Sequence, residues 1–563
     1  MRRPKRSIGL VAMVVALALA TVAACSAGTI TSRPAAKGSG GGTLVMGAEM
    51  EPDCADWLGS CAGSAWGTWA IQEHTIPRVF DYAKKQGVWT EVPSPLLTEM
   101  PTVADVGGKQ VVTYKISPKA VWSDGVPITS TDFEYTWNQV VTGEDIYDQS
   151  GYASIESVDD SDPKTAVVTF SEPYASWRTL FAAYGVLPSH LLEGKDRAAE
   201  MNDGYAWSGG PWFADWERGE QVTLTPNPKY WGKKAKIDKV VFKFIANTSA
   251  AFKAFKNGEV LAIYPQPQPD AVEQIEGGIP DTKAIVNVVT GNTEALWINN
   301  DAAPFDSLAV RQAFAYAIDR DLIIKRLFGG IGVEHALQTL NPPSQARYAD
   351  TEAYAGYTRN LKKVNQLMKG DGWAKNDDGV WEKDGQAAEI TLNTTPGDQR
   401  RRLTGQILQE MLKKAGFALT VKTNPSFFSE QLPTGDYQVA LYATVATSLD
   451  PGLCVIACSK YIPGPSNDDS GQNFQRIDVA ALDPLLETVD TAYDPTERIK
   501  AAKAADVVMA ENQVSLPLDS LPNIALWSRR IVGPVGDNPI LAMFWNMNEW
   551  SLKKNEWSLK KKG

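Results

Sequence analysis

The stretch that decides the fold spans residues 296–328, and its sequence is LWINNDAAPFDSLAVRQAFAYAIDRDLIIKRLF. Its apolar start predicts the end of a strand, and Pro304 breaks the chain after it. Ser307 and Asp319 are suitable N-caps for two helices that follow. A strand that leaves one lobe and leads into two helices of another predicts a two-lobed protein that crosses between its lobes at residues 296–300.

The two helices show which of their faces should be buried. In the first, apolar residues recur at helical spacing from Val310 to Ile318. In the second, the spacing predicts that Leu322, Ile323 and Leu327 face the core, and the helix should end at the glycines from Gly329 onward.

The rest of the chain mixes strand and helix patterns. The expected strands are 43–49, 111–116, 166–170, 240–245 and 417–422, and the expected helices are 249–256 and 401–415, the second closed by Gly416. Alternation of this kind indicates an α/β fold in which each lobe has its own sheet.

The N-terminus has the pattern of an export signal. Four of the first six residues are basic, an apolar run covers 8–24, and the closing Val-Ala-Ala-Cys resembles the lipobox of bacterial lipoproteins. We therefore expect residues 1–24 to be a lipoprotein signal peptide and Cys25 to be the lipidated first residue. The alternative is an ordinary signal with a chance cysteine. Residues 26–42 are small and polar, which predicts a flexible tether spanning roughly 20–25 Å.

Length and charge exclude other classes. A mature chain of about 540 residues should divide into two or three domains. The formal net charge of −11 repels phosphate backbones, so nucleic-acid binding is not expected. No second apolar run approaches 18 residues, so the lipid would be the only membrane attachment.

Four cysteines follow Cys25. In an exported chain they predict two disulfides, for which three connectivities exist, and local pairing of Cys54 with Cys61 and Cys454 with Cys458 is favoured. A zinc site is the alternative, but the cysteine spacings are unusual for zinc and the three histidines are scattered. No metal and no cofactor is expected.

Motifs for catalysis are missing, whereas aromatic residues are abundant. The sequence contains no nucleophile elbow, no His-Glu-x-x-His and no phosphate-binding Gly-x-x-x-x-Gly-Lys. Carboxylate pairs leave a secreted hydrolase as a remote alternative. The chain has 18 Trp and 18 Tyr, several of them beside Gly, Pro or Asp, where they can line a wet cleft. This favours a binding protein for an elongated organic ligand over an enzyme.

Several stretches agree, in order, with one known family. Residues 111–130 (VVTYKISPKAVWSDGVPITS), 209–232 (GGPWFADWERGEQVTLTPNPKYWG), 296–320 and 478–517 resemble the extracytoplasmic solute-binding proteins of peptide-type ABC importers, solute-binding protein family 5. The resemblance covers roughly residues 43–552.

The resemblance implies a two-lobed fold of the periplasmic-binding-protein type (type II) with an extra inserted subdomain. Lobe I would comprise residues 43–87, 206–296 and 519–554, the inserted subdomain 88–205, and lobe II 297–518. Residues 555–563, which repeat NEWSLKK, would be a frayed tail. The protein would be a lipid-anchored, monomeric receptor on the extracytoplasmic face of the cell membrane. It would close on an extended ligand and deliver it to ABC permease subunits.

Two segments are the expected cleft walls. Residues 49–61 follow the first strand, and residues 442–458 follow a strand of lobe II, where peptide-binding relatives place an acid that pairs with the peptide's amino terminus. That position is Thr447 here, which leaves Asp450, Glu49 or Asp53 as substitutes, although Asp450 is equally well explained as a turn residue before Pro451. The candidate ligand-binding residues are Glu49, Asp53, Trp57, Trp297, Asn299, Tyr442, Thr444, Thr447 and Asp450. The expected ligand is a small peptide, with an oligosaccharide as the alternative.

Overall fold

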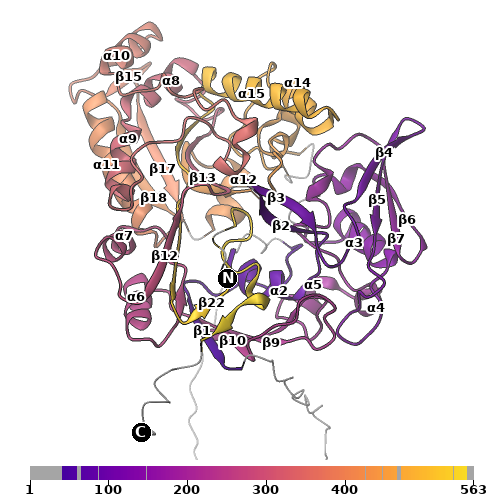
Figure 1. Cartoon of the computed structure of the whole chain (residues 1–563). Coiled ribbons are helices and arrows are strands. Elements are labelled where there is room, and N and C mark those ends of the chain that lie inside the picture. The colour runs from indigo at the N-terminus through magenta and orange to yellow at the C-terminus, as the bar shows by residue number, and fades with distance from the viewer. Residues whose placement is uncertain are drawn as a thin grey trace, which may run out of the picture. The chain divides into compact units, whose positions relative to one another are not determined.

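The strands that the structure describes form three main sheets. The computed structural model describes residues 41–553, apart from 60–64, 86–87, 147–148, 425, 447, 466–470, 535 and 537. The main sheets have seven, five and four strands (Figure 1), and three smaller sheets accompany them. Among the described helices, none combines the length and the apolar character that crossing a membrane requires.

Lobe I is built on the seven-stranded sheet, in which β1 is central and runs parallel to both of its neighbours, β10 and β11. Met46 and Ala48 of β1 are buried in the core of this lobe, beside Trp66 and Phe242. In sheet order the strands are β12 (Thr282–Asn287), β21 (Asn523–Ser528), β11 (Ala262–Ile263), β1 (Thr43–Ala48), β10 (Lys239–Phe244), β9 (Gln221–Pro226) and β8 (Trp212–Glu217). The helices of lobe I are α1 (Ala65–Gly67), η2 (Thr68–Gln72), α2 (Glu73–Thr75), α6 (Thr248–Lys256), α7 (Pro269–Glu276) and η9 (Met547–Glu549), and a small sheet pairs β22 (Ile531–Val532) with β23 (Ser551–Leu552).

The inserted subdomain has its own core, which gathers Trp122, Phe133 and Phe181. In Figure 1 it is the indigo to purple part that carries β4 to β7 and α3. Its strands are β2 (Phe80–Lys85), β3 (Val88–Pro93), β4 (Thr102–Val106), β5 (Lys109–Lys115), β6 (Ile155–Asp162) and β7 (Thr165–Phe170). Its helices are α3 (Ser130–Thr142), η3 (Tyr152–Ser154), η4 (Trp177–Thr179), α4 (Ser189–Leu192) and α5 (Arg197–Met201).

The expected boundary between residues 87 and 88 falls inside a hairpin. β2 and β3 pair along their whole length, from Phe80 opposite Pro93 to Lys85 opposite Val88. Phe80 also lies in the core of the subdomain. Both strands therefore belong with the subdomain, and its beginning lies before β2.

Lobe II is built on the five-stranded sheet and has the most extensive of the described cores. In sheet order the strands are β18 (Ala418–Thr423), β17 (Glu389–Thr394), β19 (Val439–Val445), β13 (Asn292–Ile298) and β20 (Ser515–Asp519), and a small sheet holds β14 (Ala374–Lys375), β15 (Trp381–Lys383) and β16 (Gln386–Ala387). The helices are α8 (Leu308–Ala317), α9 (Arg320–Phe328), η5 (Gly329–Ile331), η6 (Pro343–Tyr348), α10 (Leu361–Gly370), α11 (Gln399–Ala415), η7 (Phe427–Gln431), α12 (Leu432–Thr434), α13 (Cys454–Ala457), η8 (Ser459–Tyr461), α14 (Asp483–Thr491) and α15 (Pro495–Glu511).

The local signals for helix ends were mostly correct. Asp319 caps α9 by accepting a hydrogen bond from the Leu322 backbone, and Gly416 ends α11 at a φ of +95°. A side chain on Gly416 would also collide with the Trp381 indole, because a Cβ there would lie 2.9 Å from its Nε1. Ser307 occupies the N-cap position of α8, but its hydroxyl donates to Asp371 instead of capping the helix.

One inward residue of α9 was predicted wrongly. Ile323 and Leu327 are buried, but Leu322 is 38% exposed. The inward face of α9 is completed by Ile324 and Phe328 instead. The apolar spacing is compatible with a buried face that includes Leu322 and with one that includes Ile324. Packing against the rest of lobe II decides which of the two is buried.

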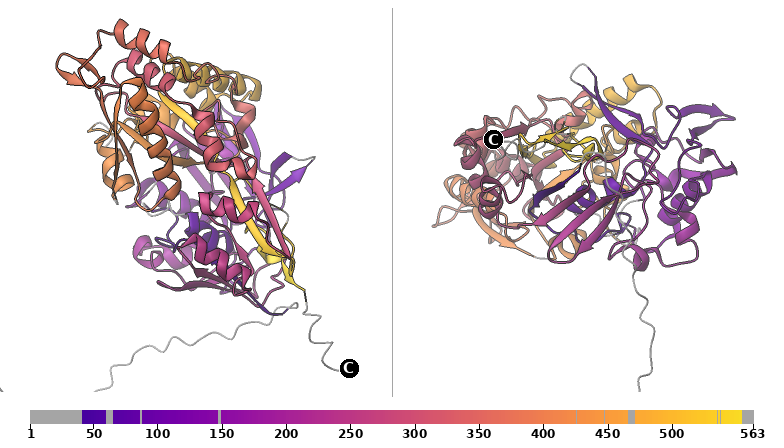
Figure 2. Two further views of the ribbon diagram at one scale, coloured as in Figure 1. Left: turned by 90° about the vertical axis from the view of Figure 1, so that its left-hand side faces the viewer. Right: turned by 60° about the horizontal axis from the view of Figure 1, so that its bottom comes forward.

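The expected crossing at residues 296–300 is wrong. Strand β13 pairs with β19 on one side and β20 on the other, so it belongs entirely to the sheet of lobe II. The chain crosses earlier, at 288–291 between β12 and β13, and returns at 520–522 between β20 and β21. Figure 2 (left) shows these two segments, pink and yellow, running side by side from one sheet to the other.

Candidate ligand-binding cleft

The two crossings are hydrogen-bonded to each other and form the base of the candidate cleft. Ser520 donates to the Val288 carbonyl at 2.6 Å, and Thr290 donates to the Leu521 carbonyl at 3.3 Å. Beside them lies a cavity of about 50 Å³, lined by Trp69, Tyr264, Pro265, Gln266, Pro267, Asn292, Leu521, Pro522, Asn523 and Ile524. Its lining comes from both lobes, with Asn292 from lobe II and Trp69 and Tyr264 from lobe I.

The wall in lobe I begins at Glu49, directly after β1. The carboxylate of Glu49 accepts hydrogen bonds from the Gln266 backbone (2.7 Å) and the Thr248 hydroxyl (2.9 Å). Burial raises its pKa to about 7 despite these bonds. The next residue, Met50, is 47% exposed, which is unusual for a large apolar side chain beside a buried strand.

The other candidates in this segment lie nearer the solvent. Asp53 is exposed, and its pKa is raised by partial burial and by the charge of Glu51. Trp57 is half-buried. Glu51 accepts hydrogen bonds from the Trp216 indole and the Gly219 backbone, so it holds the segment onto lobe I.

The wall in lobe II is the end of β19. β17 pairs with β19 at Val439 and Ala440, and the Thr394 hydroxyl at the end of β17 donates to the Leu441 carbonyl at 2.8 Å. No other described strand pairs with that edge of β19 further along. Val445 at the end of the strand is 61% exposed, and Phe428 in η7 is 52% exposed. The rings of Phe428 and Tyr442 are arranged edge to face, with their centroids 5.6 Å apart. An open strand edge beside exposed apolar side chains can add an extended chain as a further strand.

Two of the expected ligand contacts are structural instead. Trp297 is 3% exposed, donates from its indole to the Tyr442 carbonyl at 2.8 Å and stacks on the Tyr442 ring. Asn299 is 2% exposed and donates to the carbonyls of Gly435 and Tyr437. Both side chains are buried and hydrogen-bonded within lobe II, which explains their placement without a ligand.

The remaining lobe II candidates differ in accessibility. Tyr442 is 5% exposed, and its hydroxyl accepts a hydrogen bond from Gln475 at 3.0 Å. Thr444 is half-buried near the open edge, with its hydroxyl 3.4 Å from the Thr293 carbonyl. Thr447 lies outside the described residues.

Asp450 is already engaged by cations. Its carboxylate accepts hydrogen bonds from Arg347 and from the Tyr348 hydroxyl, both at 2.7 Å, and Arg498 lies 3.6 Å away. Two guanidinium groups neutralise it, so pairing with a peptide's amino terminus would require it to give up one of them. Asp450 is therefore better explained as part of a structural network.

This network joins the inserted subdomain to lobe II. Ser176 of the subdomain donates to the Pro451 carbonyl at 3.1 Å and accepts from Arg498 at 2.8 Å. Glu91 at the end of β3 has its pKa raised to about 7 by burial and then by the negative charge of Asp450. These contacts join the inserted subdomain to lobe II.

Sequence reasoning missed a buried group of charges in lobe II. Glu294 is 1% exposed and pairs with Arg400 and with Arg401, whose Nη2 lies 3.2 Å away. Asp519, on the neighbouring strand β20, has its pKa raised to about 8 by burial and by the charge of Glu294. Arg400 also donates to Asp398 at 3.0 Å. The only local signal was the run of three arginines at 400–402 after a capping Asp.

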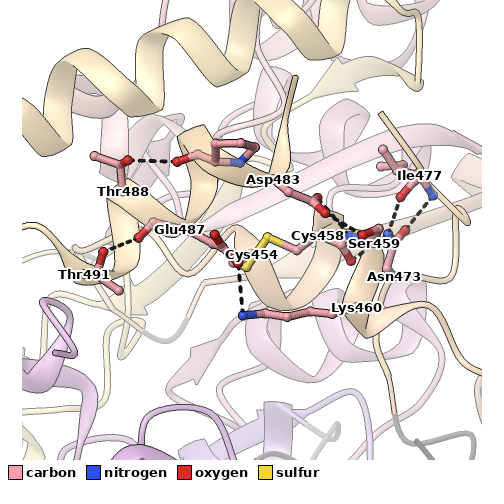
Figure 3. The surroundings of a disulfide bond; sticks show 11 residues. Cys454, Cys458, Ser459, Lys460, Asn473, Ile477, Asp483, Glu487, Thr488 and Thr491 are labelled. Atoms are coloured by element: carbon pink, nitrogen blue, oxygen red, sulfur yellow. Dashed lines mark hydrogen bonds and ion pairs between the residues drawn. A yellow bond between two sulfur atoms is a disulfide. The ribbon is translucent and has the colours of Figure 1, made fainter. Parts of the chain in front are cut away.

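A disulfide joins Cys454 to Cys458 and closes α13, as expected (Figure 3). Around it Ser459 binds Asp483, Lys460 lies 3.6 Å from Glu487, and Asn473 donates to the Cys458 carbonyl. Cys54 is also disulfide-bonded, and Cys61, its expected partner, lies outside the described residues. Because Cys454 and Cys458 bind each other, neither can bridge to Cys54 in lobe I and hold the lobes together.

Metal ligation has no support in the part of the chain that the structure describes. No group of three or more His, Cys, Asp or Glu side chains is arranged there to hold an ion.

The fold and the site together define a class. Two α/β lobes, each with its own sheet and joined by two adjacent crossings, are the architecture of a two-lobed solute-binding protein. The model of bacterial extracellular solute-binding proteins, family 5, matches residues 93–456. The chain belongs to this family.

Individual relatives agree with this assignment. The oligopeptide-binding protein OppA of Mycobacterium tuberculosis is 26% identical over 473 residues, which cover 80% of this chain and 76% of OppA. The periplasmic EDTA-binding protein EppA has the same fold, with a TM-score of 0.80 and 24% identity over 92% of this chain and 98% of its own. So does AppA of Bacillus subtilis, solved with a nonapeptide, with a TM-score of 0.77 and 21% identity over 92% of this chain and all of its own.

Proposed function

We propose that the protein is the receptor of an ABC importer and captures an extended oligopeptide between its lobes. The observation that carries the proposal is the open edge of β19 beside the exposed side chains of Val445 and Phe428. The relatives OppA and AppA, described as oligopeptide-binding proteins, support the same ligand class. The receptor has no catalytic role of its own and delivers the peptide to permease subunits as a monomer.

The peptide is held mainly through its backbone. An extended segment beside β19 can exchange N–H···O=C bonds with the strand, while its side chains lie alternately toward and away from Phe428. A conventional amine anchor is not needed for this mode. Asp450 is neutralised by Arg347 and Arg498, and Glu49 already accepts two hydrogen bonds. Among the acidic candidates, this leaves Asp53 as the carboxylate nearest the solvent.

Replacing Phe428 with alanine tests the placement of the peptide. Loss of an apolar ring that a ligand side chain covers should weaken binding of a hydrophobic pentapeptide about tenfold, equivalent to roughly 1–2 kcal/mol. The measurement is isothermal titration calorimetry of the purified protein. The matched control is Tyr493→Ala, because Tyr493 is an aromatic residue of nearly equal exposure, 53% against 52%, after α14. It should bind as the wild type does.

Modified peptides separate backbone recognition from amine recognition. N-methylation of a central amide should weaken binding by about two- to tenfold, the effect of one hydrogen bond, whereas N-acetylation of the terminus should cost less than that. If acetylation abolishes binding, an amine anchor exists and the backbone mode is wrong. If oligosaccharides bind and peptides do not, the receptor transports a sugar.

The anchoring expectation concerns residues outside the described part of the chain, and we propose it on the sequence alone. Cys25 becomes the acylated first residue after signal cleavage, and residues 26–42 tether the receptor to the membrane. Mass spectrometry of detergent-extracted protein should find a diacyl or triacyl modification on Cys25. Cys25→Ala protein should be released from the membrane fraction. An unmodified mature chain that begins beyond Cys25 would rule the anchor out.

A further inference from the structure

A second pocket lies apart from the cleft, where lobe I, the inserted subdomain and the C-terminal segment meet. Its volume is about 150 Å³, well above the space that one water needs and below the pockets that hold drug-sized ligands. None of its lining residues is shared with the cavity at the crossings. It is lined by Glu73, Ile76, Pro77, Arg78, Asp81, Ser94, Pro95, Leu96, Gly209, Gly210, Pro211, Tyr230, Trp231, Lys233, Trp545, Asn546, Asn548 and Glu549.

The pocket is built from tightly fitted segments. The backbone N–H groups of Gly209 and Gly210 both donate to the Thr75 carbonyl, at 2.8 and 3.0 Å. A side chain on Gly210 is impossible without rearrangement, because its Cβ would lie 2.2 Å from the His74 carbonyl oxygen. Trp231 is fixed by a 2.8 Å hydrogen bond from its indole to the Pro95 carbonyl. The cavity is therefore a product of the fold and does not depend on loosely packed side chains.

Glu73 is the unusual member of the lining. It is 5% exposed, and among the residues that the structure describes neither of its carboxyl oxygens has a hydrogen-bond partner. A buried carboxyl group without partners is costly, so such groups commonly mark a binding function. Trp545 also lines the pocket, and its buried indole N–H has no hydrogen-bond partner within the described part of the chain.

The other charges of the pocket are paired among themselves. Arg78 lies 3.4 Å from Asp81, and Lys233 lies 2.8 Å from Glu549. Glu73 is the remaining ionisable carboxyl among the lining residues, and it needs a donor or a cation. The half-buried rings of Tyr230, Trp231 and Trp545 provide π-faces, which favour a cation over an anion.

We propose that this pocket binds a small primary ammonium compound, with the Glu73 carboxylate as its counter-ion and the aromatic rings around its alkyl part. The site is independent of the peptide cleft and would add a second ligand specificity to the receptor. A divalent metal fits less well, because the described residues there do not bring three ligating side chains together.

Proton linkage supplies a diagnostic for this site. Burial raises the pKa of Glu73 to about 8, while Arg78 lowers it and Asp81 raises it by smaller amounts. His74 next to it has its pKa lowered to about 3 by burial, so it stays neutral. An ammonium ion must displace the proton of Glu73, so its affinity should rise roughly fiftyfold from pH 6 to pH 8 as the ionised fraction grows. An alkylamine remains protonated across this range.

The test is calorimetric titration of the purified full-length protein with propylammonium chloride in phosphate buffer at pH 6, 7 and 8. We expect binding that strengthens with pH and no binding of the neutral isostere 1-propanol. Glu73→Gln should abolish propylammonium binding while leaving peptide binding intact. Asp490→Asn is the matched control, because Asp490 is also a buried carboxyl with an unpartnered oxygen and a pKa raised to about 7, but it lies in α14.

The outcomes separate this site from the peptide cleft. No propylammonium binding by the wild type at pH 8, or equal binding by Glu73→Gln, overturns the proposal. Binding without dependence on pH also overturns it, because the carboxylate would then not be the counter-ion. A crystal soaked with 2-bromoethylammonium locates the cation directly through anomalous scattering from the bromine, and density elsewhere than beside Glu73 contradicts the site.

Discussion

Replacing Arg400 with methionine is expected to destabilise the protein by about 3–5 kcal/mol. Arg400 is 2% exposed and lies between Glu294 and Asp398, with Asp519 close to the same group. Removal of the guanidinium leaves the buried Glu294 carboxylate with Arg401 alone. The desolvation cost of that carboxylate is then only partly offset. Guanidinium chloride unfolding at pH 7, followed by circular dichroism, measures the change in the free energy of unfolding.

Arg402 provides the matched control, because it lies two residues further along the same helix and is exposed. Arg402→Met should change the free energy of unfolding by no more than about 0.5 kcal/mol. Adding Glu294→Gln to Arg400→Met should recover part of the loss, since the uncompensated charge is then absent. A loss below 1 kcal/mol for Arg400→Met would show that the group contributes little to stability.

Raising the pH should destabilise the protein, and Glu73 should account for about 4–5 kcal/mol of the loss. The pKa of Glu73 rises from 4.5 to about 8 on folding, with burial as the main cause. Between these two values the folded state holds a proton that the unfolded state has released. Stability is therefore highest below pH 4.5 with respect to this group, and it falls as the pH rises through 8.

The titration of His74 has the opposite effect on stability: at acid pH it makes stability fall as the pH decreases. Its pKa falls from 6.5 to about 3 on folding because it is buried, so its contribution is complete above pH 6.5 and is lost as the pH decreases. The free energy of unfolding, measured by urea titration from pH 5 to pH 9, should decline from about pH 6.5, where the contribution of His74 is complete, to about pH 8, where that of Glu73 is largely lost. Glu73→Gln should flatten that decline, whereas Asn548→Ala, a neutral change in the same pocket, should not. An equally steep decline in Glu73→Gln would contradict the assignment.

Features that depend on neighbours in the chain could be predicted from the sequence. The strand at 43–49, the helix at 401–415 with Gly416 after it, and the capping role of Asp319 all arise from spacing, backbone conformation and hydrogen bonds within a few residues. The local disulfide between Cys454 and Cys458 belongs here too. The family could also be predicted, because it is indicated by several stretches in the right order and each stretch is a local sequence pattern.

The spacing of residues in the sequence could not predict which distant residues pack against a given strand or side chain. Trp297 and Asn299 were expected in the cleft, but residues distant in the sequence bury them: Tyr442 packs on Trp297, and Asn299 donates to the carbonyls of Gly435 and Tyr437. Asp450 was expected to be available, but its partners Arg347 and Arg498 come from η6 and α15, elsewhere in lobe II. Leu322 and Ile323 are adjacent and both apolar, and only packing decides which of them is buried.

The sequence by itself determined an α/β chain of a two-lobed family, the bacterial extracellular solute-binding proteins of family 5. The tertiary structure decided where the chain crosses, which edge of β19 stays open, and that Glu73 lies buried beside segments as distant as Gly210 and Trp545. The physical reason is that burial and electrostatic environment depend on long-range contacts. A carboxyl group has the same local sequence whether a distant segment covers it or solvent does.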